Sequence, residues 1–465
     1  MRRLKPAWMM LVAILIVFGL AVCSPFRNFK QTARLLPARL PADPQAAYTL
    51  LQNLIHSQPG RKDLRLRLAR VEARLNQMTA AVADFEASAD LLLVEDRLKL
   101  LELYRAMSEM DTARSMARDL ANWPGLQPGQ FERLIRLQWQ MGDWSGARYS
   151  AASWILMDPE NSAAWRMAAL AAVPFEPPVA LDQMARAAAL SGSPADQSFQ
   201  TDLAAALAAA DPAARQLAIG RALGIQGEWL LARQVFETAA GNSPLIAEAW
   251  ALLGQAQMQL GEDALAALSQ AVELDPDSPM VLLALADYWL AQRQPQAALV
   301  YLEQAAAAHP EQGIWQVRIG QALTAQGDLI GALARYQQAA ELEPDNVSYW
   351  SELAVFSAVN GMNLDTVGLN AARRALLLQP DDPATLDLMG WTLAIAGEAV
   401  SAESFLRRAV AADPAYALAH LHLAQLLITG QRFSEARAEL RIAIELDGPG
   451  VVGQAAERLL ADYWK

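Results

Sequence analysis

The sequence predicts an all-α protein, an α-solenoid in which antiparallel helix pairs repeat along the chain, preceded by an N-terminal transmembrane helix. The first observation is composition: 54% of the 465 residues are apolar but only 7% are aromatic, and alanine and leucine dominate. Such a composition favours closely packed helices over sheets. The second observation is a regular series of prolines in the C-terminal half, and the third is an uncharged apolar stretch over residues 7–23.

Residues 1–23 are predicted to form a cytoplasmic stub and a transmembrane signal anchor. Arg2, Arg3 and Lys5 precede seventeen apolar residues, and a basic start favours a cytoplasmic N-terminus. We therefore expect a single-pass protein of a bacterial cell membrane, with residues 24–42 as a linker and the solenoid outside the cytoplasm. Three alternatives stay open. Residues 20–23 resemble a lipoprotein processing box that would lipidate Cys23, and residues 21–23 could instead serve as a signal-peptidase cleavage site. The opposite topology would leave the solenoid facing the cytoplasm.

The net charge of −12 is unevenly distributed along the chain. Residues 1–150 carry 21 Lys/Arg and 14 Asp/Glu, a net of +7, whereas residues 151–465 carry 17 and 36, a net of −19. This asymmetry argues against a nucleic-acid partner. The basic part suits an anionic membrane surface, or simply consists of solvated helix faces. With Cys23 as the only cysteine, the sequence excludes a disulfide framework and a cysteine-based metal site.

The repeat is visible in residues that recur at fixed spacing. Six prolines lie 32 to 36 residues apart, and each is preceded by two small residues that are seven positions apart. Proline ends a helix because it cannot donate to the helical hydrogen-bond ladder, and small residues let two helices approach closely. The prolines are Pro244, Pro276, Pro310, Pro344, Pro380 and Pro414; the small pairs run from Ala232/Ala239 through Ala332/Ala339 to Ala436/Ala443.

This pattern resembles the tetratricopeptide repeat family, and within it a membrane-anchored bacterial member. The family's 34-residue unit has an aromatic residue at position 4, Leu-Gly at 7–8, small residues at 20 and 27, a bulky apolar residue at 24 and proline at 32. Residues 313–346 match with Gly320, Ala332, Tyr336, Ala339 and Pro344. The resemblance implies a right-handed superhelix of helix-turn-helix repeats, in which Trp165, Trp250 and Trp350 occupy position 4 as core residues.

The repeats divide the chain into predicted segments. Residues 43–161 form an N-terminal repeat segment, and residues 162–212 form a degenerate repeat or bend, because three prolines interrupt the pattern there. Residues 213–450 form an array of seven repeats, of which residues 247–278 are two short and residues 347–382 are two long. Residues 451–465 are expected to form a capping helix over the last apolar face.

Nothing in the sequence predicts catalysis, a cofactor or a metal site. The sequence contains neither a metalloprotease motif, a phosphate-binding glycine loop nor a nucleophile elbow. His420 and His422 lie two residues apart on a predicted helix, and residues at this spacing do not share a face. Paired acids such as Asp381 and Asp382 fall in turns between repeats, where helix capping explains them.

The resemblance also implies where a partner would bind. In the family the first helix of each repeat lines a concave groove, chiefly through positions 2, 5, 9, 12 and 13. Trp391 stands at position 9 of its unit and is the strongest candidate for an anchor, because tryptophan offers a large apolar face. The predicted groove residues are Arg70, Arg136, Arg221, Gln255, Asp287, Gln321, Val355, Asp387, Trp391 and Gln425.

Two functions remain open at this point. The first is a non-enzymatic scaffold, tethered to the membrane through residues 7–23, that organises a protein assembly of the cell envelope. The second is an exported or lipidated receptor that captures an extended peptide or a glycan in the groove. Neither the partner nor the oligomeric state follows from the sequence.

Overall fold

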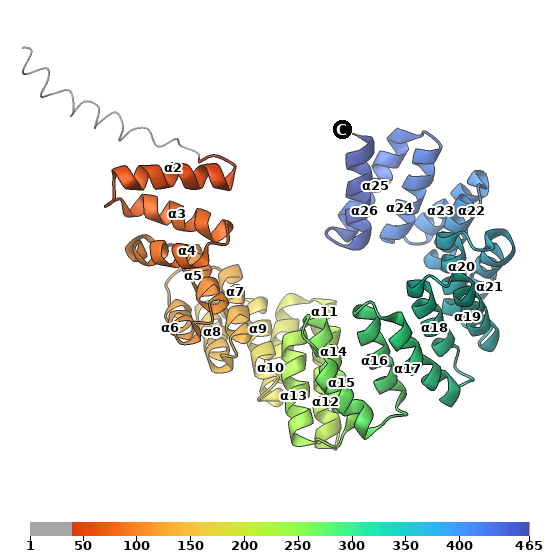
Figure 1. Cartoon of the computed structure of the whole chain (residues 1–465), viewed down its shortest axis with the longest axis horizontal. Coiled ribbons are helices and arrows are strands. Elements are labelled where there is room, and N and C mark those ends of the chain that lie inside the picture. Colours follow the sequence, from red (N-terminus) through yellow and green to blue (C-terminus); the bar gives the residue numbers. More distant parts are fainter. Residues whose placement is uncertain (1–39, 465) are drawn as a thin grey trace, which may run out of the picture. The chain divides into compact units, whose positions relative to one another are not determined.

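The computed structural model describes residues 40–464, and in this range the chain forms 25 α-helices, α2 to α26, and no strand (Figure 1). The chain divides into two compact units, one ending at Gln200 and the other beginning at Thr201. The all-α solenoid fold is confirmed for the described residues. The predicted membrane segment 7–23 and nearly all of the linker 24–42 lie outside them.

The first unit is a succession of short helices joined by tight turns (Figure 1). Several begin at a side chain that caps the exposed N–H groups of the first turn: Asp43 accepts from Gln45 and Ala46, and Asn161 accepts from Ala163. The helices are α2 (Pro44–Ser57), α3 (Lys62–Arg74), α4 (Met78–Glu86), the short 3₁₀ helix η1 (Ala89–Leu91), α5 (Val94–Ala106), α6 (Met110–Ala121), α7 (Pro128–Gln140), α8 (Trp144–Met157), α9 (Ser162–Ala172) and α10 (Pro177–Ser191).

The division between the units falls inside α11 (Pro194–Leu207). The second unit continues with α12 (Pro212–Ile225), α13 (Trp229–Asn242), α14 (Ala247–Gln259), α15 (Leu265–Leu274), α16 (Pro279–Ala291), α17 (Pro295–Ala308), α18 (Gly313–Gln326), α19 (Leu329–Leu342), α20 (Val347–Asn360), the π-helical turn η2 (Leu364–Gly368), α21 (Leu369–Leu378), α22 (Pro383–Ile395), α23 (Ala399–Ala412), α24 (Ala417–Thr429), α25 (Phe433–Asp447) and α26 (Val451–Tyr463). From α12 to α25, each predicted repeat corresponds to two successive helices that pack against each other.

The small residues of the repeat lie where helices touch. Every alanine of the recurring pairs between Ala232 and Ala443 is at most 1% exposed. Glycine at position 8 makes a second close contact, because a Cβ added at Gly390 would lie 2.7 Å from Cγ of Leu406, the bulky residue at position 24 of the same repeat. Gly220 faces Phe236 in the same way. The regularly spaced small residues therefore mark the points where the two helices of one repeat approach each other closely.

The aromatic residues at position 4 pack against the core and also form a hydrogen bond. Trp165, Trp250 and Trp350 are half-buried, and Trp250 and Trp350 pack against buried apolar clusters of their units. Each indole N–H donates to the carbonyl of the proline six residues earlier, at 2.8 to 3.0 Å. Carbonyls at the end of a helix lack an intrahelical partner. These tryptophans therefore fasten the start of one repeat to the end of the preceding one.

The two repeats of unusual length adjust at their inner turns. In residues 247–278, α15 is a ten-residue helix, and Asp263 caps it by accepting from the backbone N–H of Leu265 at 3.0 Å. In residues 347–382, Asn363 adopts a positive φ of 50°, and the π-helical turn η2 leads into α21. The two additional residues are thus accommodated without moving the small residues that contact the first helix.

The last helix, α26, packs against α24 and α25. Its buried residues are Gly453 and Ala456, and Val452 and Leu459 pack against the same apolar cluster. Residues 451–464 thus lie where the sequence placed a capping helix. Whether they are required to keep the array soluble stays a prediction.

The predicted localisation needs correction. A single-pass protein of a bacterial membrane requires a helix of roughly 20 predominantly apolar residues. Among residues 40–464, none of the helices combines that length with sufficient hydropathy to span a bilayer. The predicted span 7–23 lies outside the described residues, and a repeat solenoid by itself specifies no compartment. We therefore withdraw the membrane localisation, in either topology and as a lipoprotein.

Candidate functional site

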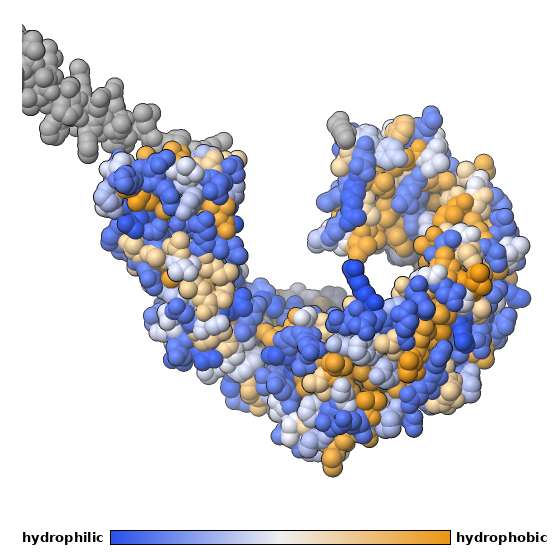
Figure 2. Space-filling model, in the orientation of Figure 1, coloured by the Kyte–Doolittle hydropathy of each residue, from blue (hydrophilic) through white to orange (hydrophobic). Residues whose placement is uncertain are grey.

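A groove of about 600 Å³ opens in the second unit between α20, α22 and α24. Three of the predicted residues, Val355, Asp387 and Trp391, line it together. They come from the first helices of neighbouring repeats, which pack side by side. Hydrophobic surface runs between bands of hydrophilic side chains on this unit (Figure 2). The structure thus brings together residues that are up to 36 positions apart in the sequence.

The groove contains a fixed aromatic pair. Trp391 on α22 stacks on the imidazole of His422 on α24, with ring centroids 5.3 Å apart and 16° between the planes. Nδ1 of His422 lies 2.9 Å and 3.0 Å from the two carboxylate oxygens of Asp387. Asp387 is 2% exposed, so this contact is largely shielded from water. The stacking on His422, which Asp387 in turn holds, therefore fixes the orientation of the Trp391 ring in the absence of a ligand.

Acidic and phenolic groups complete the wall of the groove. Burial, together with the nearby charges of Asp387 and Asp382, raises the pKa of Tyr416 to about 12. The surrounding protein raises the pKa of the Glu352 carboxyl, an effect that the more distant Arg318 partly offsets. Asp382 caps α22 by accepting from the backbone N–H of Thr385 at 3.0 Å. The groove is consequently apolar with a negative rim.

Two predicted residues form contacts close to this groove. Asp287 lies 3.6 Å from the guanidinium of Arg318, and Gln321 accepts a hydrogen bond of 3.2 Å from the same guanidinium. Burial raises the pKa of Asp287, and Arg318 opposes that shift. Arg318 was not among the predicted residues, although it holds both of them.

The other predicted residues of the second unit do not line the groove. Gln255 on α14 and Gln425 on α24 are exposed, and Arg221 on α12 forms an ion pair with Glu248 on α14. Position 9 of each repeat therefore falls on the accessible side of its first helix, but only the repeats that contain α20 and α22 contribute it to this groove.

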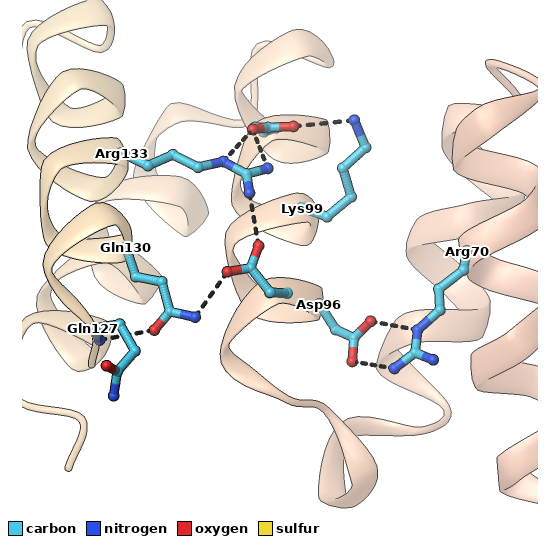
Figure 3. A network of polar contacts seen from close by, with 8 residues as sticks. Arg70, Asp96, Lys99, Gln127, Gln130 and Arg133 are labelled. Carbon is cyan, nitrogen blue, oxygen red and sulfur yellow. Dashed lines mark hydrogen bonds and ion pairs between the residues drawn. The ribbon is translucent and has the colours of Figure 1, made fainter. Parts of the chain in front are cut away.

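The predicted basic surface of the first unit is largely neutralised within the chain. Arg70 makes a two-pronged ion pair with Asp96, at 2.6 Å and 2.8 Å, and the carboxylate is nearly buried (Figure 3). Arg133 bridges Glu95 and Glu102 on α5 (Figure 3). Arg136 pairs with Glu132 at 3.1 Å and lies over the ring of Trp139. Arg70 and Arg133 thus join consecutive first helices, whereas these contacts of Arg136 lie within α7.

His422 is the residue that the sequence interpretation missed. We considered His420 and His422 only as metal ligands, and they do point to different neighbours. His420 lies between Glu439 on α25, at 2.6 Å, and the carbonyl of Pro414, at 3.1 Å. A signal was nevertheless present, because His422 follows Asp387 by 35 residues, one repeat plus one position. Within residues 40–464 the structure contains no group of three potential metal ligands.

These features define the class of protein: a helical repeat protein with a groove on the first helices of neighbouring repeats. Models of the tetratricopeptide repeat family match residues 217–279, 262–313, 320–356 and 393–449. These segments of the second unit thus match tetratricopeptide repeat models, which agrees with the predicted resemblance. Repeats of this family generally serve as non-enzymatic scaffolds that mediate protein–protein interaction. No curated protein matches the chain significantly.

The chain is similar to several solved structures at low sequence identity. Yeast Tom70 covers 96% of this chain and 95% of its own, with 13% identity and a TM-score of 0.45. The APC/C hetero-tetramer Cut9-Hcn1 covers 91% and 93%, with 13% identity and a TM-score of 0.41. Pseudomonas aeruginosa pilF covers 48% and 99%, with 21% identity and a TM-score of 0.35. At these values nothing about a partner follows for this chain.

Proposed function

We propose that the groove lined by Val355, Asp387 and Trp391 binds an extended peptide segment of a protein partner, and that the protein acts as a non-enzymatic scaffold. The observation that carries the proposal is the stacked pair of Trp391 and His422. An accessible tryptophan whose orientation is already fixed loses little conformational freedom on binding, and tryptophan is enriched among the residues that dominate binding energy.

The dimensions of the groove support a peptide rather than a folded domain. A volume of about 600 Å³ lies within the usual range of ligand pockets, and it holds a few side chains. Its walls combine apolar residues, such as Val347, Leu388 and Leu418, with a few polar groups. Such a surface suits a chain segment that buries alternate side chains. An assembly at the cell envelope and a lipidated receptor both depended on the withdrawn localisation, and neither forms part of this proposal.

Site-specific photocrosslinking in cells tests the proposal directly. A benzophenone amino acid at position 355 replaces a groove residue that is 39% exposed, and the same amino acid at position 400 replaces Val400 on α23, which is 88% exposed. We expect crosslinks to one partner segment at position 355 and not at position 400, with the segment identified by mass spectrometry. Equal crosslinking at both positions, or none at position 355, would refute the proposal.

A further inference from the structure

We propose that the groove selects peptide segments carrying a lysine or arginine, whose aliphatic stem packs beside Trp391 while its charge faces the carboxylate of Glu352. This inference rests on the proposed function, because it names the ligand class of the same groove. Glu352 on α20 and Trp391 on α22 line the groove together. Glu352 was not among the groove residues predicted from the sequence.

The acids around the groove differ in whether the chain already satisfies them. Asp382 is engaged in capping α22, Asp387 is bound by His422, and Asp287 lies 3.6 Å from Arg318. Glu352 makes neither a hydrogen bond nor a close ion pair with any residue in the described part of the chain, and its attraction to Arg318 acts over a longer distance. Among these four acids, Glu352 is therefore the one whose negative charge can attract a cationic group of a ligand.

The setting of Glu352 strengthens such an interaction. The protein around its carboxyl displaces water and raises its pKa, so a cation that approaches it restores an interaction the carboxylate has lost. A bound peptide would exclude further water, and the attraction between opposite charges grows as the surroundings become less polar. The net charge of residues 151–465, −19, would also draw a basic segment toward this unit.

Lysine and arginine match the remaining features of the groove. Their stems are apolar and pack along hydrophobic surface while the charged end reaches a polar group. Val355 supplies such a surface, and the face of a tryptophan attracts a cation within about 6 Å of its ring. An acidic peptide would instead meet Glu352 and the carboxylates beside it, while Arg318 lies beside Asp287 and His422 contacts Asp387.

The experiment uses the full chain and a library of displayed random dodecapeptides. Selected peptides are synthesised with a fluorescent label, and their affinities are measured by anisotropy for the wild type, Trp391→Ala, Glu352→Gln and the control Glu341→Gln. Glu341 is an exposed glutamate on α19 that does not line the groove. Each lysine or arginine of a selected peptide is also replaced by norleucine, which keeps the stem and removes the charge.

The inference predicts that peptides dependent on Trp391 share one basic position, and that norleucine at that position weakens binding by roughly tenfold, as expected for the loss of a charge-assisted contact. In Glu352→Gln the same replacement should cost little, because the two changes remove one interaction. Glu341→Gln should leave the effect of norleucine unchanged.

Two other outcomes separate this inference from the proposed function. In the first outcome, the selected peptides depend on Trp391, but they share no basic position, or norleucine weakens binding as much in Glu352→Gln as in the wild type. The proposed ligand class is then wrong, and the proposal that the groove binds a peptide stands. If no selected peptide depends on Trp391, both are wrong. Trp391→Phe, with a melting curve for every variant, provides a second test should Trp391→Ala fail to fold.

Discussion

Trp391 and His422 stack with their ring centroids 5.3 Å apart, although one lies on α22 and the other on α24. Asp387, one helical turn before Trp391, holds the other side of the arrangement by contacting Nδ1 of His422. Two first helices of neighbouring repeats thus share one buried carboxylate and one half-buried aromatic pair. This relationship makes the groove a fixed feature of the array.

The first prediction separates the two interactions of His422. His422→Phe keeps a ring against Trp391 but leaves Asp387, which is 2% exposed, without its donor. An unsatisfied buried polar group costs about 1–3 kcal/mol, and more when it is charged. His422→Gln keeps a donor but removes the ring. We expect His422→Phe to lower stability more in urea unfolding, and His422→Gln to weaken peptide binding more in anisotropy. The reverse order would show that the stack serves stability alone.

The second prediction concerns the close approach at position 8 of the repeat. Gly390→Ala places a Cβ 2.7 Å from Cγ of Leu406 and 3.0 Å from its backbone nitrogen, so the helices must move apart. Overpacking of this kind typically costs about 1–3 kcal/mol. Gly241→Ala, near the end of α13 and with nothing within 4 Å of the new Cβ, is the matched control. It should be neutral or stabilise the helix by a few tenths of a kcal/mol.

Both glycine variants are compared with the wild type by thermal unfolding followed by circular dichroism. If Gly390→Ala unfolds at the same temperature as Gly241→Ala, then the contact with Leu406 is not close, and the assignment of position 8 in that repeat is wrong.

The third prediction is a pH dependence that arises from Glu72 on α3. This residue is 3% exposed, one of its carboxylate oxygens lacks a hydrogen-bond partner, and burial together with the charge of Asp84 raises its pKa to about 7. The folded state therefore favours the protonated form. The contribution to stability is complete below the ordinary pKa of 4.5 and is lost as the pH rises to about 7.

Glu72→Gln removes this titration while keeping the shape of the side chain. The variant should be more stable than the wild type at pH 8, by a free energy on the order of 2 kcal/mol, and should differ little at pH 4.5. Urea unfolding at the two pH values measures the difference, with the exposed Glu341→Gln as control. A constant difference between Glu72→Gln and the wild type at both pH values would exclude the raised pKa.

The fourth prediction concerns α26. Val452, Ala456 and Leu459 cover an apolar cluster formed by α24 and α25. Deleting residues 451–465 exposes that cluster, and a repeat array whose terminal apolar face is open is expected to associate or aggregate. Light scattering of the truncated chain beside the full chain measures this. A truncated chain that stays monomeric, with unchanged unfolding, would contradict the capping role.

Spacing in the sequence was enough to predict the repeats. Prolines such as Pro344 recur because a helix ends at that position in every unit. Small residues such as Ala339 recur because two helices approach each other closely there in every unit. The resemblance to the tetratricopeptide repeat family, rather than the spacing, placed Trp391 and Val355 on the accessible side of their helices. The hydrogen bond of the position-4 tryptophans was not predicted, because a single repeat does not reveal that Trp350 has the carbonyl of Pro344 within reach of its indole N–H.

What the sequence by itself determined was the helical repeat, since it follows from contacts inside one unit, while the family resemblance indicated which face of each first helix is accessible. Only the tertiary structure decided which accessible residues act together. The contact of Asp387 with His422 and the pairing of Arg70 with Asp96 join different repeats. Such contacts depend on how one unit stacks on the next, and the angle and offset of that stacking arise from the packing of many side chains rather than from the spacing of any motif.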